Sequence, residues 1–127
     1  MKIAALIARL LLGLVFVVSG ANGFLNFIPM GPMPTGLAGQ FVTVLIQSHY
    51  VLFVSGIQLA GGVLLLVNRY VPLALVLLGP IIVNILLFHL LLNRTGLVIA
   101  IIVAILWGIV AFRHRQNFSG IFAQRTP

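Results

Sequence analysis

Four long apolar segments divide the chain, and short polar stretches separate them. The apolar segments cover approximately residues 3–24, 50–67, 72–92 and 96–112. A bilayer core of about 30 Å requires roughly 20 apolar residues in a helix, and each segment is too long and too unbroken for a β-strand. In lipid a helix also satisfies its own backbone hydrogen bonds. The pattern therefore predicts four membrane-spanning α-helices.

The two later connections between these segments contain only a few residues. They read "VNRYVP" and "LNRTG". Connections this short force neighbouring helices to run antiparallel. We therefore predict an all-α fold in which residues 1–127 form a single membrane domain, an up-down-up-down four-helix bundle.

The first connection, residues 25–49, is long and has two parts. Pro29, Pro32 and Pro34 remove backbone donors and end the first helix. Beyond them, polar and apolar residues recur at helical spacing on different faces: Gln40, Thr43 and Gln47 on one, and Leu37, Phe41, Val44 and Leu45 on another. This pattern predicts a short interfacial helix at about residues 37–48.

The composition places the chain in the membrane and leaves few catalytic groups. Of its 127 residues, 62% are hydrophobic, and it contains no Asp, Glu or Cys. This excludes carboxylate acid-base pairs, thiolate metal ligands and dithiol redox chemistry. The seven basic residues are scattered singly, which does not fit nucleic-acid binding. We expect no catalytic residues, no metal site and no cofactor of the chain's own.

The basic residues instead indicate orientation. If the N-terminus is cytoplasmic, one residue, Arg94, lies outside, and six lie inside: Lys2, Arg9, Arg69, Arg113, Arg115 and Arg125. Cytoplasmic loops are enriched in Lys and Arg. We therefore predict a multi-pass protein of the bacterial inner membrane with both termini cytoplasmic and the long first connection outside. Arg9 is expected to snorkel to the inner headgroups.

The first segment also imitates a targeting peptide. Two basic residues precede an apolar run, and the small residues Ser19, Gly20 and Ala21 follow it. At least three further apolar segments follow, which favours an uncleaved membrane span.

Polar side chains inside the spans are costly, so their positions are informative. At 1.5 Å per residue, Gln58 and Asn84 each lie about 12 Å inside the outer ends of their helices. Ser55 precedes Gln58 by three residues, while Ser19, Asn22 and Asn26 form a stripe where the first helix emerges. We predict a polar outer pocket with six candidate ligand-binding residues: Asn22, Asn26, Ser55, Gln58, Asn84 and His89.

Interhelical hydrogen bonding is the alternative role for these residues. The positions Gly56/Ala60 and Gly61/Gly62 would let helices approach closely. His89 lies five residues after Asn84, about 140° around an ideal helix, so the two need not share one site. Pro80 removes one backbone hydrogen bond, leaves the carbonyl of Val76 free, and can kink this helix.

Three runs resemble the DoxX-like family of small bacterial four-helix membrane proteins: "GLVFVVSGANGFLNF", "IQLAGGVLLLVNRYVPLAL" and "VNILLFHLLLN". The resemblance spans roughly residues 5–115 and implies a four-span bundle. Members have been linked with thiosulfate-to-quinone electron transfer and with oxidative-stress complexes. Relatives often carry a lysine where this chain has Gly23 and a glutamate where it has Gln58, so the family's ionisable site is neutral here.

The resemblance implies an accessory or anchoring subunit of a membrane redox complex, in which other membrane subunits supply the cofactors and the outer pocket meets a quinone or a lipid. A stand-alone small-molecule binder or transporter is the alternative. A b-type haem protein that uses His49 and His89 is a third possibility, and it requires two histidines on facing helices at similar depth.

Overall fold

The computed structural model describes residues 2–27 and 34–125, except for the side chain of Phe122, and this part of the chain is helical without a strand. The helices are α1 (Lys2–Leu25), α2 (Gly36–Gln47), α3 (Tyr50–Val67), α4 (Val71–Leu87), the π-helix η1 (Phe88–Leu92), α5 (Leu97–Arg113) and the 3-10 helix η2 (Arg115–Phe122). The predicted all-α class is confirmed. Pro29 and Pro32, which were expected to turn the chain, lie outside the described residues.

Three helices are long and apolar enough to cross a membrane: α1, α3, and α4 continued by η1. A fourth span results if α5 and η2 are counted together, although they are bent by 84° relative to each other. The predicted boundaries of the four apolar segments and of the interfacial helix agree with the observed helices to within one residue.

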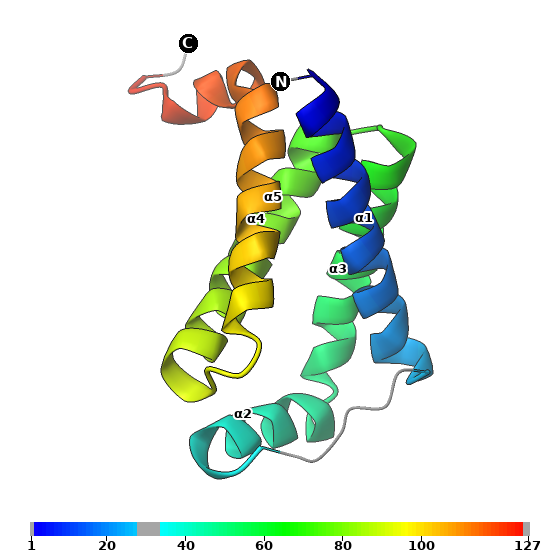
Figure 1. Ribbon diagram of the computed structural model, residues 1–127, viewed down its shortest axis with the longest axis vertical. Coiled ribbons are helices and arrows are strands. Elements are labelled where there is room, and N and C mark those ends of the chain that lie inside the picture. Colours follow the sequence, from blue (N-terminus) through cyan, green and yellow to red (C-terminus); the bar gives the residue numbers. More distant parts are fainter. Residues whose placement is uncertain (1, 28–33, 126–127) are drawn as a thin grey trace.

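The helices pack side by side, and α2 closes one end (Figure 1). Helix α1 packs against α3 and α5, while α4 packs against the same two neighbours. Helix α2 runs across the lower end and contacts α3 and η1. The N- and C-terminal ends of the chain both lie at the upper end.

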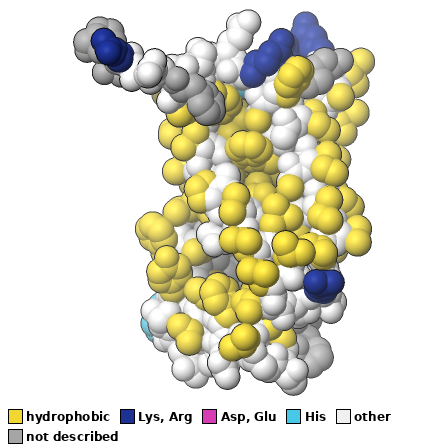
Figure 2. All heavy atoms as spheres, turned by 90° about the vertical axis from the view of Figure 1, so that its left-hand side faces the viewer, with side chains coloured by type: hydrophobic (Ala, Val, Ile, Leu, Met, Phe, Trp, Pro, Cys, Tyr) yellow, Lys and Arg dark blue, Asp and Glu magenta, His cyan; other side chains and the backbone are white. Residues whose placement is uncertain are grey.

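The side chains at the centre of the bundle come from every long helix. Those that are large and fully buried are Leu12, Phe16, Leu65, Leu75, Leu78 and Val110. Elsewhere the apolar side chains point outward, and Figure 2 shows them covering the middle of one face. Such a surface is what a lipid environment requires of a membrane-spanning bundle.

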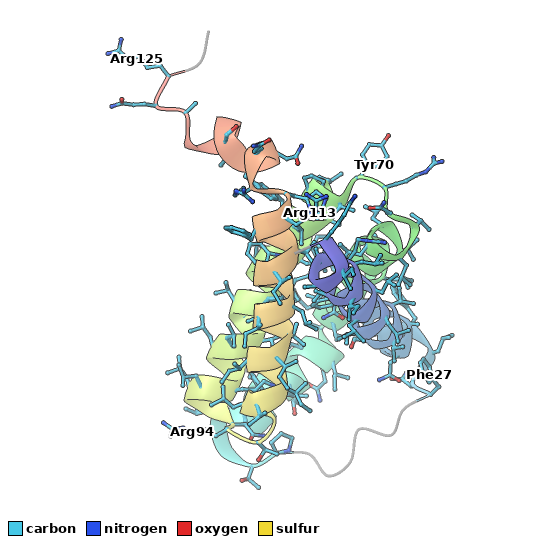
Figure 3. All side chains as sticks on the ribbon, turned by 45° about the horizontal axis from the view of Figure 1, so that its top comes forward. Phe27, Tyr70, Arg94, Arg113 and Arg125 are labelled. Atoms are coloured by element: carbon cyan, nitrogen blue, oxygen red, sulfur yellow. The ribbon has the colours of Figure 1, made fainter. Side chains whose placement is uncertain are left out.

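Basic side chains lie mainly beyond this apolar band. Arg113 and Arg125 lie at the upper end together with Tyr70, whereas Arg94 lies at the lower end, as does Phe27 (Figure 3). Arg9 differs from the prediction because its Nη1 donates to carbonyl oxygens of α3 rather than standing free for headgroups. The acceptors are Leu65 and, at 3.4 Å, Leu66.

Glycines set the separation between α1 and α3. A Cβ at Gly62 would lie 2.7 Å from the backbone nitrogen of Val17, and a Cβ at Gly20 would lie 2.5 Å from that of Leu59. Gly61 faces α4 instead, where a Cβ would lie 2.8 Å from Leu78. The predicted close approach is found at Gly61 and Gly62. It is not found at Gly56, where the nearest atom would be 3.9 Å away.

Two side chains donate to backbone carbonyls of α4 near Pro80, which lies inside this helix. The indole Nε1 of Trp107 in α5 donates to the Leu75 oxygen at 2.9 Å, and the amide of Asn84 donates to the Pro80 oxygen at 3.0 Å. The Trp107 ring also packs where Gly79 has no side chain, 3.5 Å from the position of a Cβ. The segment around Pro80 is thus held by side chains from α5 and from α4 itself.

We expect Trp107→Phe to lower the free energy of unfolding by about 0.5–1.5 kcal/mol, because it removes one hydrogen bond and keeps most of the packing. Unfolding by SDS, followed by circular dichroism in detergent, would measure the change. Phe112→Leu, at an exposed position of the same helix, is the control. A Trp107→Phe variant as stable as the unaltered chain would show that this hydrogen bond contributes nothing.

Candidate functional site

A cavity of about 710 Å³ lies at the lower end of the bundle, between α2, α3 and the end of α4. This volume falls within the range of about 300–1,000 Å³ that is typical of small-molecule sites. We call it the outer pocket. Its lining is mainly apolar and aromatic and contains no Lys, Arg, Asp or Glu. The polar members are Ser48, Tyr50, Gln58, Asn84 and His89.

Helix α2 forms one wall of the outer pocket. Phe41, Val44, Leu45 and Ser48 face it at positions i, i+3, i+4 and i+7, which places them on one side of the helix. The Phe41 ring contacts Phe88 of η1, with the ring centroids 5.6 Å apart. The apolar face recognised in the sequence therefore covers the pocket.

Helix α4 and η1 form a second wall through two adjacent rows of residues. Pro80, Asn84 and Phe88 make one row, and Ile81, Ile85 and His89 make the other, each at a spacing of four. The cavity is wide enough to contact both rows. Asn84 and His89 consequently line the same pocket although they point in different directions from the helix.

The polar side chains of the lining are already partly held in place. The Asn84 amide donates one hydrogen to the Pro80 oxygen, which leaves its carbonyl oxygen and a second hydrogen for other partners. His89 is half-buried, and its Nδ1 lies 3.1 Å from the carbonyl oxygen of Asn93. Gln58, from α3, is also half-buried.

A smaller cavity of about 240 Å³ adjoins the outer pocket and is bordered by α1, α3, α5 and the end of α4. Ser19 and Gly96 line it, and it shares Gln58, Ile85 and His89 with the outer pocket. These three shared residues therefore lie between the two cavities. Gln58 and His89 can meet a ligand from either side.

The family model for DoxX matches residues 4–91, more than two thirds of the chain. The chain belongs to the DoxX family. The match includes every residue that lines the outer pocket, while α5 lies beyond it. Comparison with curated proteins and with solved structures finds no match.

Three of the six predicted site residues of this DoxX protein lie outside both cavities. Ser55 is buried in the α1–α3 contact. Asn22 is half-buried on α1, and Asn26 is exposed just after that helix, where its backbone nitrogen donates to the Asn22 oxygen at 2.8 Å. The structure thus brings together Gln58, Asn84 and His89, but not the α1 stripe.

Gly23 packs directly against Ser55. A Cβ at Gly23 would lie 1.8 Å from the Ser55 Oγ. At this helix separation there is no space for the lysine that the family resemblance leads one to expect at this position. Gly23 and Ser55 therefore depend on each other sterically in this DoxX protein.

At the junction of α2 and α3, some residues line the outer pocket and others do not. His49 is exposed, directly precedes α3 with a left-handed backbone (φ 62°), and is not part of the outer-pocket lining. The outer pocket therefore does not unite His49 with His89, as haem ligation would require. Tyr50 and Ser48 line the pocket but were not predicted. Both residues lie where α2 gives way to α3, and this position was the feature of the sequence that could have indicated their role in the pocket.

Proposed function

We propose that this DoxX protein is an accessory or anchoring subunit of a membrane-bound redox complex, and that its outer pocket holds a quinone or a lipid. The observation that carries the proposal is the outer pocket itself. It combines aromatic walls with a few polar side chains, among them Gln58, Asn84 and His89, which is the usual composition of a site for an amphiphilic small molecule.

The distribution of charge supports an orientation for the pocket. Arg113 and Arg125 lie at the end opposite to Arg94 (Figure 3), and six of the seven basic residues belong to the predicted cytoplasmic side. With the upper end in the cytoplasm, both termini are cytoplasmic, the helices cross the inner membrane up-down-up-down, and the outer pocket opens near the outer face.

The scarcity of reactive groups supports an accessory role. The chain has no Asp, Glu or Cys, and the outer pocket has no charged lining residue. The groups it offers can orient a neutral ligand by hydrogen bonding, while other membrane subunits would carry the redox cofactors. The chain's own part is to bind and to anchor.

Stand-alone small-molecule binding or transport is the second candidate, favoured by the irregular part of α4. Pro80 lies inside α4 without a backbone donor, and η1 ends the helix as a π-helix next to the outer pocket. Interrupted helices commonly line substrate sites in transporters. Substrate-dependent flux in vesicles that contain the chain alone would favour this function over the first.

Purification from native membranes in a lipid-retaining polymer tests the first function. We expect mass spectrometry to find a defined partner subunit with a redox cofactor, together with a bound neutral quinone or lipid. Recovery of the chain alone, without partner or bound amphiphile, would contradict the proposal.

A pocket-filling substitution separates the two parts of the proposal. We expect Val54→Trp to reduce the amount of co-purifying amphiphile at least severalfold, because the larger ring occupies the outer pocket, and to leave the partner subunit bound. Val98→Trp is the matched control, since Val98 is an exposed residue of α5 that is not among the lining residues. Equal amphiphile in both variants would place the bound molecule elsewhere.

A further inference from the structure

A backbone carbonyl fixes the hydrogen of the His89 imidazole. Nδ1 lies 3.1 Å from the Asn93 carbonyl oxygen. A carbonyl oxygen can accept a hydrogen bond but cannot donate one, so Nδ1 must carry the hydrogen. The neutral imidazole has a single N–H, and its other nitrogen, Nε2, is therefore an acceptor.

The residues around η1 keep this carbonyl in place. The backbone nitrogen of Asn93 donates to the Phe88 oxygen at 3.0 Å, and the Asn93 side chain accepts from the backbone nitrogen of Thr95 at 3.0 Å. Gly96, at φ +87°, leaves room for the imidazole, because a Cβ there would lie 3.1 Å from Cε1 of His89. The ring is thus held by both a hydrogen bond and packing.

The Nε2 atom of His89 belongs to a side chain that borders both cavities. It makes no hydrogen bond to any of the residues that the structure describes. Among those residues no buried side-chain nitrogen or oxygen lacks a partner, so Nε2 is not sealed inside the protein. Since His89 lines both cavities, a ligand there can reach this acceptor.

The other polar groups of the outer pocket do not discriminate between hydroxyl and carbonyl ligands. The amides of Gln58 and Asn84 and the hydroxyls of Ser48 and Tyr50 can all both donate and accept. No charged residue lines the pocket, so nothing there balances an anionic or cationic headgroup. The imidazole is the group whose fixed hydrogen can decide between ligands.

We infer that the outer pocket selects a neutral amphiphile with a ring hydroxyl, in practice the quinol form of a quinone, and that Nε2 of His89 accepts the hydroxyl hydrogen. The inference rests on the proposed function of the pocket and specifies the chemical class and the redox form of its ligand. A quinone carbonyl, which has no hydrogen to donate, leaves Nε2 without this bond.

Three probes with the same ring test the selection: a short-tailed hydroquinone, its quinone, and its dimethyl ether. Titration calorimetry on the full chain in lipid nanodiscs, under argon, measures each affinity. We expect the hydroquinone to bind about tenfold more tightly than the other two, the effect of one additional hydrogen bond. The ether separates the contribution of the hydroxyl hydrogen from that of the ring.

Substitution of the histidine should remove this preference. We expect His89→Phe to bind hydroquinone about tenfold more weakly and quinone unchanged, because the ring remains while the acceptor is lost. His114→Phe is the matched control. The Nδ1 of His114 is also paired with a carbonyl, that of Val110 at 3.0 Å, but His114 directly follows α5, far from the pocket.

Nitrogen NMR of histidine-labelled, unsubstituted protein provides a second test that does not depend on the variants folding. We expect the Nδ1–H tautomer at His89, and a shift of the Nε2 signal on adding hydroquinone but not its ether. An Nε2–H tautomer, or equal affinities for all three probes, would overturn the inference and leave the proposed function standing. If none of the probes bound, the quinone part of the proposed function would fail as well.

Discussion

Replacing Gly20 with alanine should destabilise the bundle strongly, because the added methyl group would meet the backbone of α3. A Cβ at this position would lie 2.5 Å from the backbone nitrogen of Leu59, 2.7 Å from the Ser55 oxygen and 2.9 Å from the Leu59 Cα. All three atoms belong to the main chain, so a rotamer change cannot relieve the clash. We expect a loss of about 1–3 kcal/mol or more, because α1 and α3 must separate.

The same substitution at two other glycines supplies the controls. Gly108 of α5 has nothing within 4 Å of its Cβ position, and Gly56 of α3 has only a Phe24 ring atom at 3.9 Å. Alanine at either position should leave the bundle equally stable or slightly more stable, because alanine favours helix by about 1 kcal/mol over glycine.

Unfolding by SDS, followed by circular dichroism, should therefore rank the three alanine variants. Gly20→Ala should unfold at the lowest SDS fraction, and the other two should unfold close to the unsubstituted chain. Similar behaviour of Gly20→Ala and Gly56→Ala would mean that the close approach of α1 and α3 is not required for stability.

The helices of this protein could be predicted closely because lipid leaves the backbone few choices. Long apolar segments must form helices in a bilayer, and the breaks between them coincide with Asn, Pro and Gly residues. The helix-to-helix contacts could not be predicted in the same way. Gly61 and Gly62 are adjacent in sequence, yet one faces α4 and the other faces α1. Spacing gives the face of a helix but does not identify its partner.

The candidate site, too, could be predicted only in part, because the sequence does not show which helices face one another. Gln58 and Asn84 were expected at the same depth, and both line the outer pocket with His89. Depth alone also suggested Asn22 and Asn26, but α1 is not a wall of that pocket. The rotation of each helix about its axis depends on packing against all neighbours, and one sequence does not specify it.

Helix α2 illustrates what the sequence does contain. Its apolar face was visible in the spacing of Phe41, Val44 and Leu45, and the helix was expected to lie in the membrane interface. In the structure this face covers the outer pocket and Phe41 contacts Phe88. An amphipathic pattern predicts that a face is buried, whereas lipid and protein are equally good apolar partners for it.

Replacing Arg9 with methionine should produce the second large loss of stability. The Arg9 guanidinium donates to carbonyl oxygens of Leu65 and Leu66, in the last turn of α3. Carbonyls in a last turn lack regular intrahelical partners, and among the described residues the Leu65 oxygen otherwise accepts only a long bond of 3.4 Å from the backbone nitrogen of Asn68. A cation is also favoured at a helix C-terminus. Hydrogen bonds to a charged group contribute about 1.5–3 kcal/mol each, so Arg9→Met should lower the free energy of unfolding by at least about 2 kcal/mol.

A change in membrane orientation could also weaken an Arg9 variant, and the choice of control removes that explanation. Arg69→Met deletes the same formal charge from the same predicted side of the membrane, but Arg69 is exposed in the turn between α3 and α4. Arg9→Lys should lie between the unsubstituted chain and Arg9→Met, because an ammonium keeps the charge but not the fork of donors. If Arg9→Met and Arg69→Met lost stability equally in SDS titrations, the charge alone would be responsible. A larger loss for Arg9→Met would mean that the first helix stabilises the end of the third through this side chain.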